Sequence, residues 1–135
     1  MRSRLWILAA VIGLLGAGGR PVAHHALSAE YDVNKPITLT GVVTKIEWLN
    51  PHARFYLDVK DGRGAVVSWN LQLASPNGLV RNGWSRKTLN VGDEVTVEGW
   101  MARDGSKMAN AHVVKLADGR RVSGAGPVGN GPAPQ

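Results

Sequence analysis

The sequence predicts an all-β protein: a small five-stranded OB-like barrel with a short helical connector between strands three and four. Three observations predict this fold. Several short stretches alternate apolar and polar residues, as strands with one buried face do. Turn signals such as Asp61-Gly62 and Asp104-Gly105 separate these stretches. A helix-start signal, Ser75-Pro76, follows the third stretch, and three strands, a connector and two more strands is the OB order.

The first predicted strand covers residues 37–49 and changes its inward phase at Gly41. Ile37 and Leu39 lie in one phase before the glycine, whereas Val42 begins the other phase after it. A strand absorbs such a slip through a bulge, and glycine tolerates the bulge geometry. We therefore expect one long, bent strand that pairs with neighbours on both sides. Two short strands joined by a turn at the glycine are the alternative.

An Asn-Pro-His corner ends the first strand, because Pro51 has no N–H for a strand ladder and disfavours a continued strand at Asn50. Residues 53–60 and 65–73 then form the second and third predicted strands. Alternate residues of these two strands are expected to face the core and the opposite side. The core set is Phe55, Leu57, Val59, Val67, Trp69, Leu71 and Leu73. The outward set is Arg54, Tyr56, Asp58, Ser68, Asn70 and Gln72.

The second half of the chain continues with the connector and two more strands. Ser75 is a predicted N-cap, with a proline at the first helical position, for a short helix over residues 76–81. Strands four and five are predicted over residues 94–101 and 109–116, within a barrel domain that covers 37–118. A β-sandwich would need more strands than this length provides. Residues 119–135 are rich in Gly and Pro, lack periodicity, and predict a disordered tail.

Residues 1–23 resemble a secretory signal peptide, with two early arginines, an apolar run over residues 5–15 and small residues after it. The apolar run is shorter than the roughly 20 residues that a membrane-spanning helix needs. Cleavage is predicted after Gly19 or after Ala23, and an uncleaved anchor is the alternative. We therefore expect a periplasmic or secreted protein without a stable membrane span. Residues 24–36 are predicted to be an extended N-terminal arm.

The composition excludes some classes of function. The chain carries 16 Lys and Arg against 10 Asp and Glu, a net charge of +6. Removal of residues 1–23 takes away three arginines and lowers the charge to about +3. That charge is too small to predict a nucleic-acid partner. The absence of cysteine excludes disulfides and thiolate metal sites.

Histidines are the candidate metal ligands. His24 and His25 are adjacent on the arm, His52 lies in the Asn-Pro-His corner, and imidazole nitrogens suit copper(II) and zinc. Cleavage after Ala23 would make the amine and ring of His24 a chelating pair, which His25 or His52 could complete. The alternative is that all three are solvated or hydrogen-bonded turn residues. The fourth, His112, shares its predicted face with Val114 and Leu116 and is expected to be a hydrogen-bonded residue at the core edge.

Two tryptophans offer a different function. Trp84 and Trp100 would form a stacking platform for an oligosaccharide or other polymer if both rings were exposed; packing of Trp84 over one end of the barrel is the alternative. We find neither paired carboxylates suited to acid–base chemistry nor a G-x-S-x-G elbow. The sequence thus predicts an exported, non-enzymatic binding or accessory domain, with a metal-dependent enzyme as an alternative. It identifies no partner.

An ordered set of short motifs extends over most of the chain. They are Ala23-His24-His25, Ala29-Glu30-Tyr31-Asp32, Gly41-Val42-Val43-Thr44-Lys45, Asn50-Pro51-His52, Ser75-Pro76-Asn77-Gly78-Leu79 and Gly92-Asp93-Glu94-Val95-Thr96-Val97-Glu98-Gly99. Together, over roughly residues 23–118, this set resembles a family of exported bacterial proteins known only as a domain of unknown function. The resemblance implies an exported OB-like barrel and no established activity.

Overall fold

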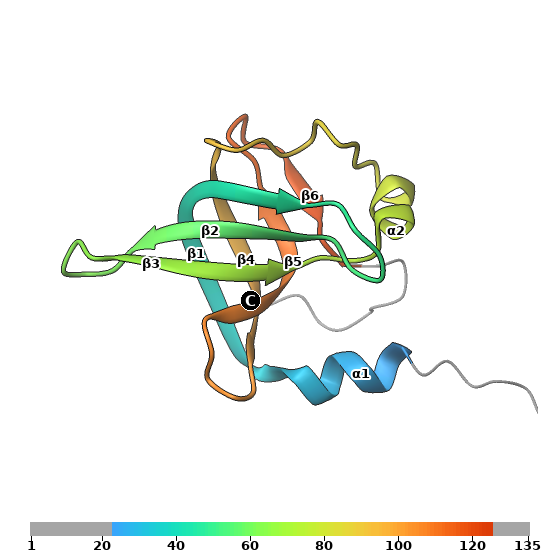
Figure 1. Ribbon diagram of the computed structural model, residues 1–135, viewed down its shortest axis with the longest axis horizontal. Coiled ribbons are helices and arrows are strands. Elements are labelled where there is room, and N and C mark those ends of the chain that lie inside the picture. The colour runs from blue at the N-terminus through green and yellow to red at the C-terminus, as the bar shows by residue number, and fades with distance from the viewer. Residues whose placement is uncertain (1–22, 126–135) are drawn as a thin grey trace, which may run out of the picture.

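The computed structural model describes residues 23–125 of the 135-residue chain, and side chains from residue 27 onward. The predicted signal peptide, apart from Ala23, and residues 126–135 of the predicted tail lie outside the described residues. The elements in chain order (Figure 1) are α1 (Ala23–Glu30), β1 (Tyr31–Glu47), β2 (Arg54–Lys60), β3 (Val66–Gln72), α2 (Pro76–Arg81), β4 (Glu94–Ala102), β5 (Met108–Lys115) and β6 (Arg121–Ser123).

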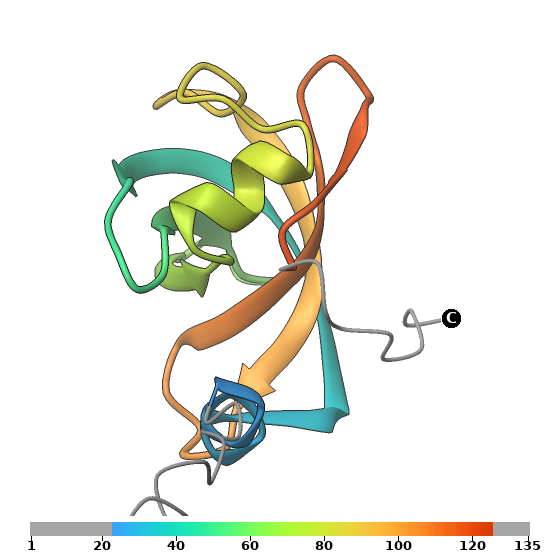
Figure 2. The same ribbon diagram turned by 90° about the vertical axis from the view of Figure 1, so that its right-hand side faces the viewer.

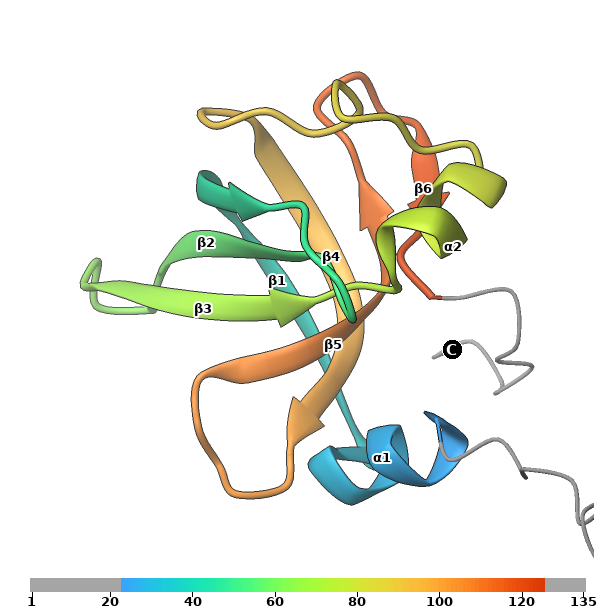
Figure 3. The ribbon, with the colours of Figure 1, turned by 45° about the vertical axis from the view of Figure 1, so that its right-hand side comes forward.

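The six strands form one sheet that closes on itself. Its hydrogen-bonded order is β3-β2-β1-β4-β5-β6, and an additional pairing of β3 with β5 completes a ring of five strands. The β3–β5 pair is parallel and the other pairs are antiparallel. Because α2 lies between β3 and β4 in the chain, the predicted all-β, OB-like architecture is confirmed (Figures 1 and 3). Within residues 23–125, no helix has the length and apolar character needed to cross a membrane.

The long, bent first strand is also confirmed. The part of β1 from Pro36 to Val42 pairs with β4, and the part from Val42 to Glu47 pairs with β2. One strand therefore contributes to two sides of the ring. The Asn50-Pro51 corner follows it, and β2 begins at Arg54.

The predicted position of the bulge is wrong. The register of the β1–β2 pair shifts between Val43 and Lys45, not at Gly41. As a result Val42 is 41% exposed, whereas Val43 is 1% exposed and lies in the core. Gly41 has a different role: a Cβ there would collide with the backbone carbonyl of Asp58, so the glycine permits close approach of β2.

The interior of the ring is apolar. Phe55, Leu57 and Leu71 are fully buried, and each side chain of this size stabilises the fold by about 1.5–3 kcal/mol relative to an exposed one. Residues of α2 and of the segment that follows it close one end. The other buried members of this core are Leu39, Val43, Ala53, Trp69, Leu73, Leu79, Trp84, Leu89, Val95, Val97, Ala109, Ala111, Val114 and Leu116.

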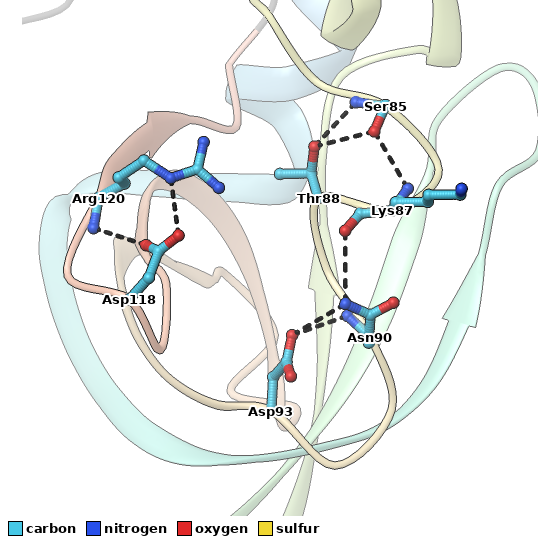
Figure 4. A network of polar contacts seen from close by, with 7 residues as sticks. All are labelled: Ser85, Lys87, Thr88, Asn90, Asp93, Asp118 and Arg120. Atoms are coloured by element: carbon cyan, nitrogen blue, oxygen red, sulfur yellow. Dashed lines mark hydrogen bonds and ion pairs between the residues drawn. The ribbon is translucent and has the colours of Figure 1, made fainter.

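Local polar contacts fix the connector. The Ser75 hydroxyl oxygen accepts a hydrogen bond from the Gly78 N–H (3.2 Å), which confirms the predicted N-cap of α2. Beyond α2, turns rather than a second helix lead to β4. Figure 4 shows their contacts, in which the N–H of Ser85 donates to Thr88 and that of Asn90 donates to Asp93. The Asp118–Arg120 contact in the same view belongs to the turn before β6.

Both ends of the described chain differ from the predictions. The predicted extended arm contains helix α1, and β1 begins at Tyr31, six residues before the expected start. Within the predicted disordered tail, residues 121–123 form β6, which pairs with β5. The Trp84 Nε1–H also donates to the Ser123 carbonyl (2.8 Å). Backbone groups make most of these contacts, and a hydrophobic pattern does not reveal them.

Candidate functional site

The Asn-Pro-His corner holds His52 in solvent next to a fixed point of the backbone. His52 is exposed, and Ala53 beside it is fully buried. The Ala53 N–H donates to the Ala74 carbonyl (3.0 Å), and the Leu73 N–H donates to the Ala53 carbonyl (2.9 Å). This pair of bonds ties the end of the corner to the segment before α2. A ligand that binds the imidazole would therefore meet an accessible ring on an anchored loop.

Helix α1 carries the other two predicted metal ligands, His24 and His25, whose side chains lie outside the described residues. The end of the helix is anchored, because the Arg103 N–H donates to the Glu30 carbonyl (2.9 Å) and the Arg103 Nε–H donates to the Ser28 carbonyl (2.7 Å). Figure 2 shows α1 nearly end-on, next to the last residues of β4. In Figure 1 the β1–β2 loop and the start of α1 lie on the same side of the molecule.

The described residues do not assemble a metal centre by themselves. Among residues whose side chains are described, no group of three or more His, Asp or Glu lies close enough to hold an ion. The predicted set of His24, His25 and His52 thus depends on two rings that are outside this description. Its test is biochemical.

His112 is buried, but its surroundings differ from the prediction. The β4–β5 register pairs Glu98 with Val113 and Gly99 with Ala111, so His112 is the extra residue of a bulge. Because of this bulge, His112 does not share the inward face of β5 with Val114, contrary to the prediction. Its ring instead meets the Trp100 ring, with centroids 3.8 Å apart and an interplanar angle of 74°. Burial lowers the pKa of His112 from its ordinary value of 6.5.

The predicted stacking platform is wrong. Trp84 and Trp100 are both buried, so neither presents a free ring face to a polymer. Trp84 belongs to the core inside the ring, as its alternative interpretation predicts. Trp100 belongs to a separate outer apolar cluster with Tyr31 and Ala102, against which Leu27 and Met108 pack. Because α1 and the start of β1 contribute to this cluster, the sequence pattern of β4 alone did not reveal it.

A polar cluster on the outside of the ring, the Arg54 cluster, was missed by the sequence analysis. It consists of Tyr31, Arg54, Asn70 and Gln72. The Arg54 Nη1–H donates to Asn70 Oδ1 (3.2 Å), and its Nη2–H donates to Gln72 Oε1 (2.9 Å). The Tyr31 hydroxyl donates to the same Gln72 oxygen (3.0 Å). Burial raises the pKa of Tyr31, more than the nearby Arg54 charge lowers it, so the phenol keeps the proton that it donates.

One signal in the sequence was available for this cluster. Arg54 pairs directly with Gln72, and Tyr56 with Asn70, across the β2–β3 hairpin. The Asp61-Gly62-Arg63-Gly64 turn fixes that register, so the turn already indicates that an arginine faces two amide side chains. Nothing comparable indicated Tyr31, because its position depends on α1 and the bent start of β1.

A hollow of about 260 Å³ lies between the end of α1 and the β4–β5 hairpin. Its lining includes Glu30, Tyr31, Asp104 and Ser106. The Asp104 carboxylate accepts the Ser106 N–H (2.9 Å), as aspartate commonly does in a tight turn. The hollow therefore borders the Arg54 cluster through Tyr31, and the Asp104 carboxylate in its lining already stabilises the turn.

The fold and these groups define a class: a closed, OB-like all-β domain with an exposed histidine corner and a polar cluster on its outer face. The chain belongs to the family described as "Family of unknown function (DUF6152)", which matches residues 11–111. The resemblance to a family known only as a domain of unknown function is thereby confirmed. The match includes both predicted histidine motifs and the Arg54 cluster. Comparison with curated proteins and with solved structures gave no match.

Proposed function

We propose that this protein is an exported, non-enzymatic binding or accessory module that holds copper(II) or zinc through His24, His25 and His52. One observation carries the proposal: His52 is exposed on a loop that the Ala53–Ala74 and Leu73–Ala53 hydrogen bonds anchor. An anchored imidazole loses less freedom on binding than one on a mobile loop. The position of α1, with its start on the same side as this loop, adds support.

The proposed ligand set combines two segments of the chain. His24 and His25 belong to the first turn of α1, and His52 belongs to the anchored corner loop. The terminal amine of the mature chain would add a further nitrogen ligand. Cleavage after Ala23 would supply that amine on His24 itself. Copper(II) is the ion that such nitrogen ligands bind most tightly.

The proposed ligands also explain why an enzyme is the weaker alternative. Among the described side chains, no group of three or more His, Asp or Glu forms around His52, and the buried His112 packs against the Trp100 ring. A metal held here would be bound by two residues of α1 and by one residue of the anchored corner loop. Such a site suits reversible metal binding.

The test is a titration of the purified mature protein with copper(II) and zinc by calorimetry, with its N-terminus defined by mass spectrometry. We expect one ion per chain, and a loss of affinity of about tenfold or more in His52→Ala and in His24→Ala, since each removes a ligand. The matched control is Asn50→Ala, which changes the same corner without removing an imidazole. Unchanged affinity in both histidine variants would contradict the proposal. Recovery of the protein in the cytoplasm at full length would contradict export.

A further inference from the structure

Arg54 forms no close ion pair with a carboxylate among the described residues, although, after the hydrogen bond from Lys45, its charge is one of the causes that lower the pKa of Glu47. All ten Asp and Glu residues lie between residues 30 and 118, within the part whose side chains are described. None of them forms an ion pair with Arg54 within 4 Å. Glu47 lies directly opposite on β1, but its carboxylate pairs with Lys45 (2.6 Å) and accepts the Tyr56 hydroxyl (3.4 Å).

The guanidinium is only partly solvated, and it is held in place by neutral groups. Its two hydrogen bonds go to the amide oxygens of Asn70 and Gln72. An arginine side chain has five N–H donors, and these two bonds use two of them. The neutral Tyr31 hydroxyl also interacts with the guanidinium. A half-buried cation with neutral partners retains a desolvation cost that an anion would offset.

The neighbours of Arg54 fix its orientation. Gln72 is almost fully buried, and its amide oxygen accepts from both Arg54 and the Tyr31 hydroxyl. Because Tyr31 belongs to the outer apolar cluster, packing under α1 holds Gln72 in position, and Gln72 in turn holds the guanidinium. Ligand-binding groups that are fixed in this way lose little entropy when a ligand binds.

We infer that Arg54 anchors an oxoanion-binding site on the outer face of the ring, where it takes a carboxylate or phosphate group of a ligand. The planar guanidinium fork matches both groups, because each offers two oxygens for parallel N–H···O bonds. Asn70 and Gln72 are positioning residues for that fork. The site uses no metal and is independent of the histidine proposal.

The test is an NMR titration of the isotope-labelled mature protein, freed of metal on a chelating resin because soluble chelators are themselves carboxylates. Inorganic phosphate and acetate are added separately, with sodium chloride used to hold ionic strength constant. We expect a saturable shift of the Arg54 Nε–H signal, with smaller shifts of the Asn70 and Gln72 side-chain amides. The anion that saturates at the lower concentration identifies the chemical class of the ligand.

Three variants separate this site from general attraction to a basic protein. Arg54→Gln should weaken binding by about tenfold or more, and Arg54→Lys should be intermediate because it keeps the charge but loses the fork. Arg121→Gln is the matched control, because the charge of Arg121 is already paired with the Glu98 carboxylate (2.8 and 2.9 Å) whereas Arg54 donates to neutral oxygens. The Arg121→Gln variant should bind as the wild type does. Chemical shifts that change linearly with the concentration of both anions, without saturation, would overturn the inference. Equal losses of anion affinity in Arg54→Gln and Arg121→Gln would also overturn it. The wild-type titration alone decides if Arg54→Gln does not fold.

Discussion

Both the inner and the outer face of the ring carry side chains that are buried from solvent, but for different reasons. Two consecutive residues of β3 show this: Leu71 points inward and is 0% exposed, whereas Gln72 points outward and is 1% exposed. Leu71 is covered by the other strands of the ring. Gln72 is covered by Tyr31 and Arg54, which bind its amide oxygen. Burial on the inner face follows from the sheet itself, and burial on the outer face requires α1 and the start of β1.

This difference assigns separate tasks to the two faces. An unpaired polar group inside the ring would cost free energy with no compensating bond, so that face contributes stability and no chemistry. On the outer face the polar groups of the Arg54 cluster bind one another, and the guanidinium at its centre has no carboxylate within ion-pair distance. A fixed polar group next to solvent is what a binding site needs. Function is therefore expected on the outside of this ring and at its corner loop.

The largest effect that separates the faces is expected for Leu71→Ala. Removal of this fully buried side chain should lower the free energy of unfolding by about 2–5 kcal/mol, because it leaves a cavity among close-packed strands. Val66→Ala is the control on the same strand, since Val66 is 58% exposed and should cost about 0.5 kcal/mol or less. Urea unfolding followed by tryptophan fluorescence measures both. Equal losses would mean that the ring interior is not the main source of stability.

The inner face was largely predictable and the outer face was not. Alternation in residues 53–60 and 65–73 identified Phe55, Leu57 and Leu71 correctly, because a strand with one apolar face has a period of two. The same rule predicted an outward Gln72 without showing that it is buried. At Gly41 the rule found a phase change but misplaced it, since the steric demand at the glycine and the register shift after Val43 are separate features three residues apart.

A smaller effect is expected for Tyr31→Phe on the outer face. The variant loses the hydroxyl bond to Gln72 but leaves that oxygen bonded to Arg54, so the cost should be about 1 kcal/mol rather than the larger penalty of an orphaned buried acceptor. Tyr56→Phe is the matched control, because its longer bond reaches a Glu47 carboxylate that Lys45 also holds. Its cost should be smaller. A larger loss in Tyr56→Phe would contradict the role given to Tyr31, and urea unfolding distinguishes the two outcomes.

The candidate site was predictable where local chemistry defines it. Pro51 marks a corner, and an imidazole next to it at His52 is readable from three residues. The Arg54 cluster combines residues 31, 54, 70 and 72, and only the hairpin register connects three of those positions in advance. The two tryptophans were misjudged for different reasons. Trp84 belongs to the core inside the ring, whereas Trp100 is outward and is covered by residues of α1 and of the start of β1.

The smallest expected effect is a pH dependence that arises from His112. Burial against Trp100 lowers its pKa in the folded protein, so the unfolded chain takes up a proton at a higher pH than the native protein does. Stability is then complete above the unfolded pKa near 6.5 and decreases as the pH falls below it, until the lower native pKa is reached. This decrease occurs at higher pH than the loss of stability from carboxylates. Carboxylates with lowered pKa values, such as Glu98, lose their contribution to the free energy of unfolding near pH 4.5 and below. Urea midpoints measured from pH 7.5 to 5 should fall for the wild type and fall less for His112→Gln. Equal decreases of the urea midpoint in the wild type and in His112→Gln would show that protonation of His112 beside Trp100 does not destabilise the folded protein. Burial on the outer face would then impose no penalty on a charge at this position.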